Sequence, residues 1–97
     1  MSLEIILTPK AKATLLSVVS FIEAEWGQKS AEKFVTKVYK TLDNISKQPY
    51  LFKAYSENEV RIGLITKQTS VVYRIGIEKI EILFFWDNRQ DPIISDQ

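Results

Sequence analysis

The chain has 97 residues, of which 45% are hydrophobic and 26% charged, a composition typical of one ordinary soluble globular domain. It contains neither cysteine nor histidine, which excludes disulfides, thiolate or histidine-ligated zinc sites and a Ser-His-Asp triad. The net charge of +1 is smaller than is usual for proteins that bind nucleic acid through phosphates, although a local basic cluster can act alone.

The first half of the chain predicts a strand followed by two helices. Residues 3–7 form a short apolar strand, and Thr8 and Pro9 suit the N-cap and first position of a helix. Gly27 is a natural stop for this helix and begins a second helix over about 28–47, which Pro49 closes. Spacings of three and four define one apolar face on each helix: Ala11, Leu15, Val18, Ile22 and Trp26 on the first, and Ala31, Phe34, Val38, Leu42 and Ile45 on the second.

The short connection at Gly27 favours an antiparallel helical hairpin, and we expect Trp26 at its tip to pin the two helices together. The second half predicts three strands joined by hairpins, over residues 59–66, 70–77 and 80–86, followed by an irregular tail over 87–97. The order is β-α-α-β-β-β. It predicts a single α+β domain over residues 1–97, with one antiparallel sheet covered on one face by the helical hairpin.

Alternation within the strands predicts which residues face the helices. In the last strand we place Ile80, Ile82, Phe84 and Trp86 in the core. The opposite, open face then gathers Arg61, Arg74, Glu81, Asp87 and Arg89 around Val72, Leu83 and Phe85. An apolar patch rimmed by charge favours a partner site. The alternative is a face covered by the chain's own tail, through Ile93 and Ile94.

No apolar run approaches the ~20 residues of a membrane helix, and the N-terminus lacks the apolar segment of a signal peptide. We therefore expect a cytoplasmic protein that does not associate with membranes. The composition and motifs indicate no cofactor and no metal.

Several segments in order resemble one known family, the RelE/ParE toxin superfamily. They are Trp26-Gly27 at the hairpin tip with Ala31, Phe34 and Pro49 after it, then Val60-Arg61, the segment 66–70, Val72-Tyr73-Arg74-Ile75, residues 80–85 and the ending 86–92. The resemblance implies the toxin of a type II toxin–antitoxin (plasmid stabilisation, or addiction) module that inhibits growth. It also implies a cognate antitoxin that wraps along the toxin. RelE-like members cut messenger RNA in the ribosome, whereas ParE-like members inhibit DNA gyrase.

A metal-independent ribonuclease needs a base, an acid and cations that stabilise the phosphorane. The resemblance assigns the cationic role to Arg61 and Arg89. Two departures count against this activity: Ser70 stands where ribonuclease members commonly carry an arginine, and residues 93–96 lack the expected aromatic or histidine acid–base group. Asp87 and Asp91 would also partly neutralise a phosphate site near Arg89.

Three hypotheses follow. The favoured one is a ParE-like toxin that binds a protein target through its open face, with Arg61, Arg74, Leu83, Phe85, Asp87 and Arg89 as partner-binding residues. The alternatives are a ribosome-dependent endoribonuclease and a non-toxic interaction module. Structural roles compete for the arginines. Arg61 can pair with Glu81 across the sheet, Arg74 can form a structural cross-strand pair, and Arg89 can shape the tail with Asp87 and Asp91. A homodimer and a heterotetramer with the antitoxin are both compatible with the family resemblance.

Overall fold

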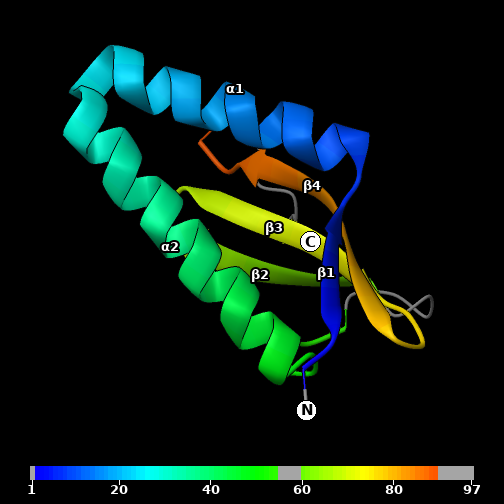
Figure 1. Ribbon diagram of the computed structural model, residues 1–97. Helices are drawn as coiled ribbons and strands as arrows, with labels where there is room; N and C mark the ends of the chain where they lie inside the picture. The colour runs from blue at the N-terminus through cyan, green and yellow to red at the C-terminus, as the bar shows by residue number, and fades with distance from the viewer. Residues whose placement is uncertain (1, 55–59, 90–97) are drawn as a thin grey trace, which may run out of the picture.

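A computed structural model describes residues 2–54 and 60–89. It contains strand β1 (Glu4–Leu7), helices α1 (Pro9–Trp26) and α2 (Gln28–Lys47), and strands β2 (Val60–Thr66), β3 (Thr69–Ile75) and β4 (Lys79–Asp87). Both helices lie on one side of the sheet (Figure 1). The predicted order and the α+β class are confirmed. Strand β3 ends at Ile75, two residues earlier than expected, while residue 59 and the tail from 90 onward lie outside the described residues.

The four strands form one sheet in the order β1-β4-β3-β2. The pairs β2–β3 and β3–β4 are antiparallel, as predicted, but β1 runs parallel to β4, so the expectation of a wholly antiparallel sheet is wrong. The helices explain this orientation. Because α1 and α2 have 18 and 20 residues, they carry the chain out and back to the start of β1, where Ser46 Oγ donates to the Leu3 carbonyl at 2.6 Å. Strands β2, β3 and β4 then follow as a meander in which each strand reverses direction, so that β4 runs parallel to β1.

The N-terminus of α1 is fixed to the sheet by its cap. Thr8 Oγ1 accepts a hydrogen bond from the Ala11 backbone N–H at 3.0 Å, and its hydroxyl lies 3.0 and 2.9 Å from the Ile82 and Leu83 carbonyl oxygens of β4. Gly27 separates the helices with φ 94°, a conformation that favours glycine. Sequence signals thus set both ends of α1.

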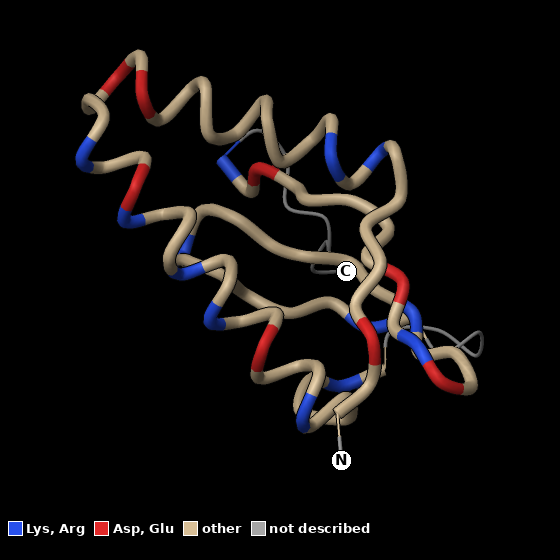
Figure 2. The backbone as a smooth tube through the Cα atoms, viewed as in Figure 1, with Lys and Arg blue, Asp and Glu red and all other residues tan. Residues whose placement is uncertain are grey.

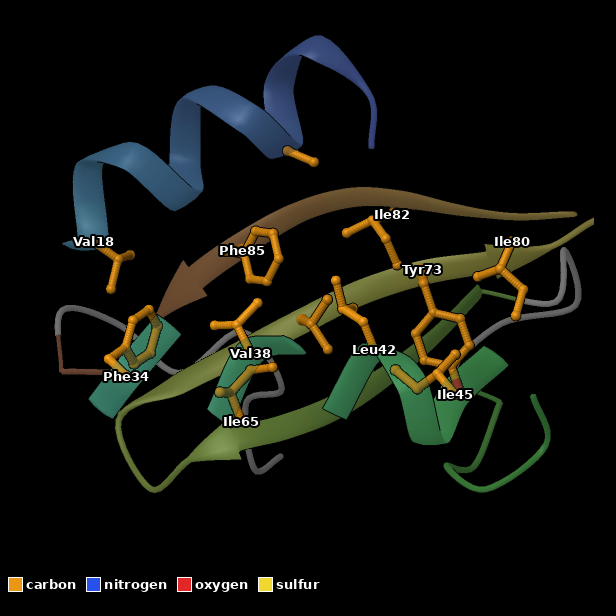
Figure 3. Packing of buried hydrophobic residues seen from close by; sticks show 12 residues of the cluster. Val18, Phe34, Val38, Leu42, Ile45, Ile65, Tyr73, Ile80, Ile82 and Phe85 are labelled. Carbon is orange, nitrogen blue, oxygen red and sulfur yellow. The ribbon is translucent and has the colours of Figure 1, made fainter. Parts of the chain in front are cut away.

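The core lies between the helices and the sheet (Figure 3). The apolar positions predicted for α2 are all buried. They meet strand residues that are almost completely buried, Val71, Tyr73, Ile80 and Ile82. Trp26 is more exposed than a residue that pins the two helices would be: it is 58% exposed and packs edge-on against Phe21 of its own helix, with ring centroids 5.9 Å apart, although it also lines a hollow with Phe34 of α2.

A β-bulge in β4 reverses the predicted alternation. Val72 pairs with Phe84 and Tyr73 with Ile82, which leaves Leu83 as the extra residue. Residues beyond the bulge therefore change faces. Phe85 points toward the helices and is 2% exposed, as Figure 3 shows, so its prediction as an open-face residue is wrong. Phe84 and Trp86, predicted for the core, are half-buried on the other face.

The sequence of β2 does not show which of its residues face the helices. Arg61 and Gly63 pair with the inward-facing Tyr73 and Val71, so they face the helix side of the sheet. The ring of Phe52 covers Gly63, with two ring carbons 2.5 Å from the position that a Cβ would occupy. Outward-facing residues of β2 are Val60, Ile62 and Leu64.

Candidate functional site

Arg61 lies beneath the segment that connects α2 to β2. Its side chain is buried, Nη1 donates to the Phe52 carbonyl at 2.6 Å, and the guanidinium stands 4.7 Å from the centroid of the Tyr50 ring. An isolated bridge also joins Arg61 to Ala54. The predictions that Arg61 belongs to the open face and pairs with Glu81 are wrong, because the register of β2 turns this side chain to the helix side. Arg61 anchors a loop.

Tyr73 supports the same loop from the neighbouring strand. Its hydroxyl donates to the Pro49 carbonyl at 2.9 Å. Burial raises the pKa of the Tyr73 phenol, against the lowering effect of nearby Arg61. The phenol is therefore protonated at neutral pH and acts as a hydrogen-bond donor, a role that suits structure better than proton abstraction.

Arg74 forms the cross-strand pair that the sequence suggested. Its Nη2 and Nε lie 2.8 and 3.3 Å from Glu81 Oε1 on the face away from the helices. The hydrogen bond from Arg74 lowers the pKa of the Glu81 carboxyl. Both side chains are accessible to solvent, so the pair contributes little to stability while leaving its outer edges open to a partner.

Arg89 is held where the end of β4 meets α1. It makes a bidentate pair with Asp87 through Nε (2.9 Å) and Nη2 (2.6 Å), and its guanidinium stacks 4.1 Å from the Phe21 ring centroid and 6.0 Å from that of Trp26. Hydrogen bonding to Arg89 lowers the pKa of the Asp87 carboxyl and raises that of the guanidinium. The local pairing of Arg89 with Asp87 is confirmed. Their placement on the open face is wrong, because Asp87 pairs with inward-facing Thr69 beyond the bulge.

The two candidate catalytic arginines do not share a site. Arg61 pairs with Tyr73, whereas Asp87, the partner of Arg89, pairs with Thr69. Four residues of an extended strand separate these positions on β3 by roughly 13 Å. A hollow of about 640 Å³ beside Arg89 is lined mainly by α1 and the end of β4, including Thr14, Phe21, Phe85 and Asp87.

The face of the sheet away from the helices, here the outer face, is apolar as expected but differs in composition. Leu64 on β2 is 58% exposed there, and Ile62, Phe84 and Trp86 are half-buried. Between β2 and β4 on this face lie Ser70 and the predicted patch residue Val72, and both are buried, Val72 with 3% exposed. The Phe84 and Trp86 rings meet edge-on at 6.5 Å, and Lys10 Nζ lies 4.6 Å from the Phe84 centroid. The remaining predicted residue, Leu83, occupies the bulge. The alternative in which Ile93 and Ile94 cover this face lies outside the described residues.

Sequence reasoning missed the aromatic partners of the arginines. Phe21 and Trp26 hold Arg89, while Tyr50 and Phe52 hold Arg61. The sequence carried one signal for this. Phe21 falls outside the apolar stripe of its helix, where an aromatic ring can serve as the platform for a cation such as Arg89.

Within residues 2–54 and 60–89, no helix has the length and apolarity to cross a bilayer. The same residues include no cluster of three or more carboxylate side chains placed to hold a metal ion.

Comparison with known proteins identifies the family of the chain. Residues 5–92 match the model of the ParE toxin of the type II toxin–antitoxin system parDE. Among solved structures, the fold is similar to that of a chromosomal ParDE toxin–antitoxin system from P. aeruginosa, with a TM-score of 0.73 and 21% identity over 89% of this chain and 96% of that one.

Two further structures share the fold. The YoeB dimer from Staphylococcus aureus has a TM-score of 0.58 and 18% identity, covering 87% of this chain and 94% of that chain. A copper-bound mutant toxin from Helicobacter pylori has a TM-score of 0.58 and 15% identity, covering 92% and 98%. No curated protein matches the chain significantly. Because the family model spans nearly the whole sequence, this chain belongs to the ParE toxin family of type II toxin–antitoxin systems.

Proposed function

We propose that this type II toxin acts in the cytoplasm by binding a protein target such as DNA gyrase, and that a cognate antitoxin neutralises it by covering part of the same surface. The observation that carries the proposal is the engagement of both candidate catalytic arginines in structural contacts. Arg61 is buried beneath a loop, and Arg89 is clamped by Asp87 and two aromatic rings.

Cleavage of RNA through the ribose 2′-hydroxyl requires cations aimed at the phosphorane and a proton acceptor within reach. Arg61 directs a guanidinium nitrogen at a backbone carbonyl, and the Asp87 carboxylate occupies two nitrogens of Arg89. The nearby Tyr73 phenol has a raised pKa, which disfavours it as a base. These features support protein binding over catalysis.

The outer face offers a surface for such binding. Leu64, Ile62, Phe84 and Trp86 present apolar area, and the Arg74–Glu81 pair borders it. Apolar surface with a charged rim is typical of protein interfaces. The sheet also ends in β1 and β2, and an antitoxin tail could add a strand to such an edge and fold as it binds. Either a homodimer or a heterotetramer with the antitoxin is compatible with this arrangement.

Inducible expression in a bacterial host tests the proposal, with parallel pulse labelling of DNA and protein synthesis within minutes of induction. We expect DNA synthesis to stop first. In vitro, the purified toxin should inhibit supercoiling by gyrase. If supercoiling is untouched, gyrase is not the target.

The alternatives give other outcomes. An early stop in protein synthesis with site-specific cuts in translated RNA would indicate a RelE-like endoribonuclease. In that case Arg61→Ala and Arg89→Ala are the first variants to test. Normal growth with folded protein present would indicate a non-toxic interaction module.

A further inference from the structure

A second hollow lies where the tip of the helical hairpin meets the turn between β2 and β3. Its volume is about 310 Å³, at the low end of the range for ligand pockets. Helix α2 contributes Lys33, Lys37 and Phe34, helix α1 contributes Trp26, and Gln68 and Arg89 close the opposite side. We call it the tip hollow.

The tip hollow is electrostatically one-sided. Lys33 and Lys37 are four residues apart on α2 and so project from the same face. Lys29 stands one turn earlier, and Figure 2 shows the row of basic positions along this helix. None of the described residues lining the hollow is Asp or Glu. Asp87 pairs with Arg89 from outside the lining, and Glu25 acts on the same guanidinium. The positive charge that faces the hollow therefore comes mainly from the two lysines.

The hollow also has an apolar side. The Trp26 indole is 58% exposed, although it stands beside the half-buried Ile22 and the buried Phe34. An exposed tryptophan next to apolar side chains is typical of interfaces, because its large ring gains much by burial and its N–H still needs a partner. Lysines beside such a ring fit a ligand that carries both negative charge and an apolar group.

We propose that the tip hollow binds an acidic segment of a partner protein, with one bulky apolar side chain seated against Trp26 and flanking carboxylates paired with Lys33 and Lys37. This inference goes beyond the proposed function, which uses the outer face, because it assigns a second binding surface on the helix side of the sheet and names the chemistry of its ligand. A protein segment fits better than a nucleic acid. The net charge of the chain is only +1, and Arg89, the one arginine among the described lining residues, already holds a carboxylate.

The test uses a fluorescein-labelled synthetic peptide with one leucine between pairs of aspartate and glutamate, titrated with the full chain and followed by fluorescence anisotropy. A Lys33→Glu/Lys37→Glu double variant should weaken binding by about tenfold or more, because attraction becomes repulsion. The matched control is Lys12→Glu/Lys40→Glu, which changes the net charge equally at exposed positions outside the hollow. It should keep the wild-type affinity. Binding should weaken with added salt.

Tryptophan fluorescence gives a second readout at the site itself. The peptide should change the emission of the wild type and of Trp86→Phe, but not that of Trp26→Phe. The inference is overturned if the peptide does not bind or if both charge-reversed variants lose affinity equally. It is also overturned if a single-stranded oligonucleotide competes better than the peptide, or if self-association fills the hollow. Because the assay measures binding rather than growth, it can fail independently of the proposed toxicity.

Discussion

At the scale of single residues, the arginines of this toxin show how neighbours decide a side chain's role. Arg61 and Arg74 stand on adjacent strands, yet the first is buried under a loop and the second is exposed to solvent. A buried guanidinium must be hydrogen-bonded to be tolerated. Arg61 Nη1 donates to the Phe52 carbonyl, and this hydrogen bond ties the loop to β2.

Arg61→Met should therefore destabilise the fold by about 2 kcal/mol, the magnitude typical of hydrogen bonds to charged groups. The Phe52 carbonyl would lose its donor while the side-chain volume stays similar. Urea denaturation measures the free energy of unfolding, and Arg74→Met is the control because its pair with Glu81 is solvent-accessible. Equal losses in both variants would contradict the anchoring role of Arg61.

Asp87 gives the protein a dependence of stability on pH. Hydrogen bonding to Arg89 holds the folded-state pKa of Asp87 below its ordinary value of 3.8. A lowered pKa contributes stability that is present above the unfolded-state value and lost as the pH falls through the folded-state value. Between pH 6 and pH 3, Asp87→Asn should thus lose less stability than the wild type. The loss of stability that comes from protonation of Glu81, whose pKa is also lowered, should remain in this variant. An unchanged loss in Asp87→Asn would exclude the pair as its source.

At the scale of elements, the helices and the inward residues Ile80 and Ile82 could be predicted from sequence, whereas the faces of β2 and of β4 beyond its bulge could not. The apolar stripe of α2 and the caps Thr8 and Gly27 are local signals. The bulge at Leu83 is not, because its partner strand determines it and one extra residue exchanges the two faces beyond it. Phe84 and Phe85, both bulky and aromatic, give no clue to which lies inside. The bulge also misplaced Asp87 and Arg89 in the candidate site, while Arg61 was misplaced because the register of β2 turns it to the helix side.

Strand β2 offers a direct test of its inward face. A methyl group on Gly63 would lie 2.5 Å from the Phe52 ring, so Gly63→Ala should destabilise the protein by about 1–3 kcal/mol through overpacking. In a Phe52→Ala background the same substitution should cost much less, since the clash is gone. Four unfolding experiments complete the double-mutant cycle. Additive effects would mean that the ring does not cover Gly63.

At the scale of the whole molecule, the sheet divides the toxin into two unlike surfaces. The helices seal one face into a core, while the other retains the exposed Leu64 and half-buried Phe84 and Trp86. In a domain of 97 residues, apolar surface that stays outside the core does not stabilise the isolated fold, but a bound partner can bury it. The contacts at Arg61 and Arg89 face the helix side, so a partner on the outer face need not disturb them.

This division predicts that toxicity and stability can be separated on the outer face. Leu64→Glu places a charge on the exposed apolar part of the outer face, on edge strand β2, and should weaken target binding by about tenfold or more, delaying growth arrest after induction. It should leave thermal unfolding nearly unchanged, because Leu64 is already 58% exposed. Ile77→Glu is the matched control: Ile77 is 95% exposed in the β3–β4 turn, and its variant should arrest growth like the wild type. Full toxicity of Leu64→Glu would move the target-binding surface away from the outer face.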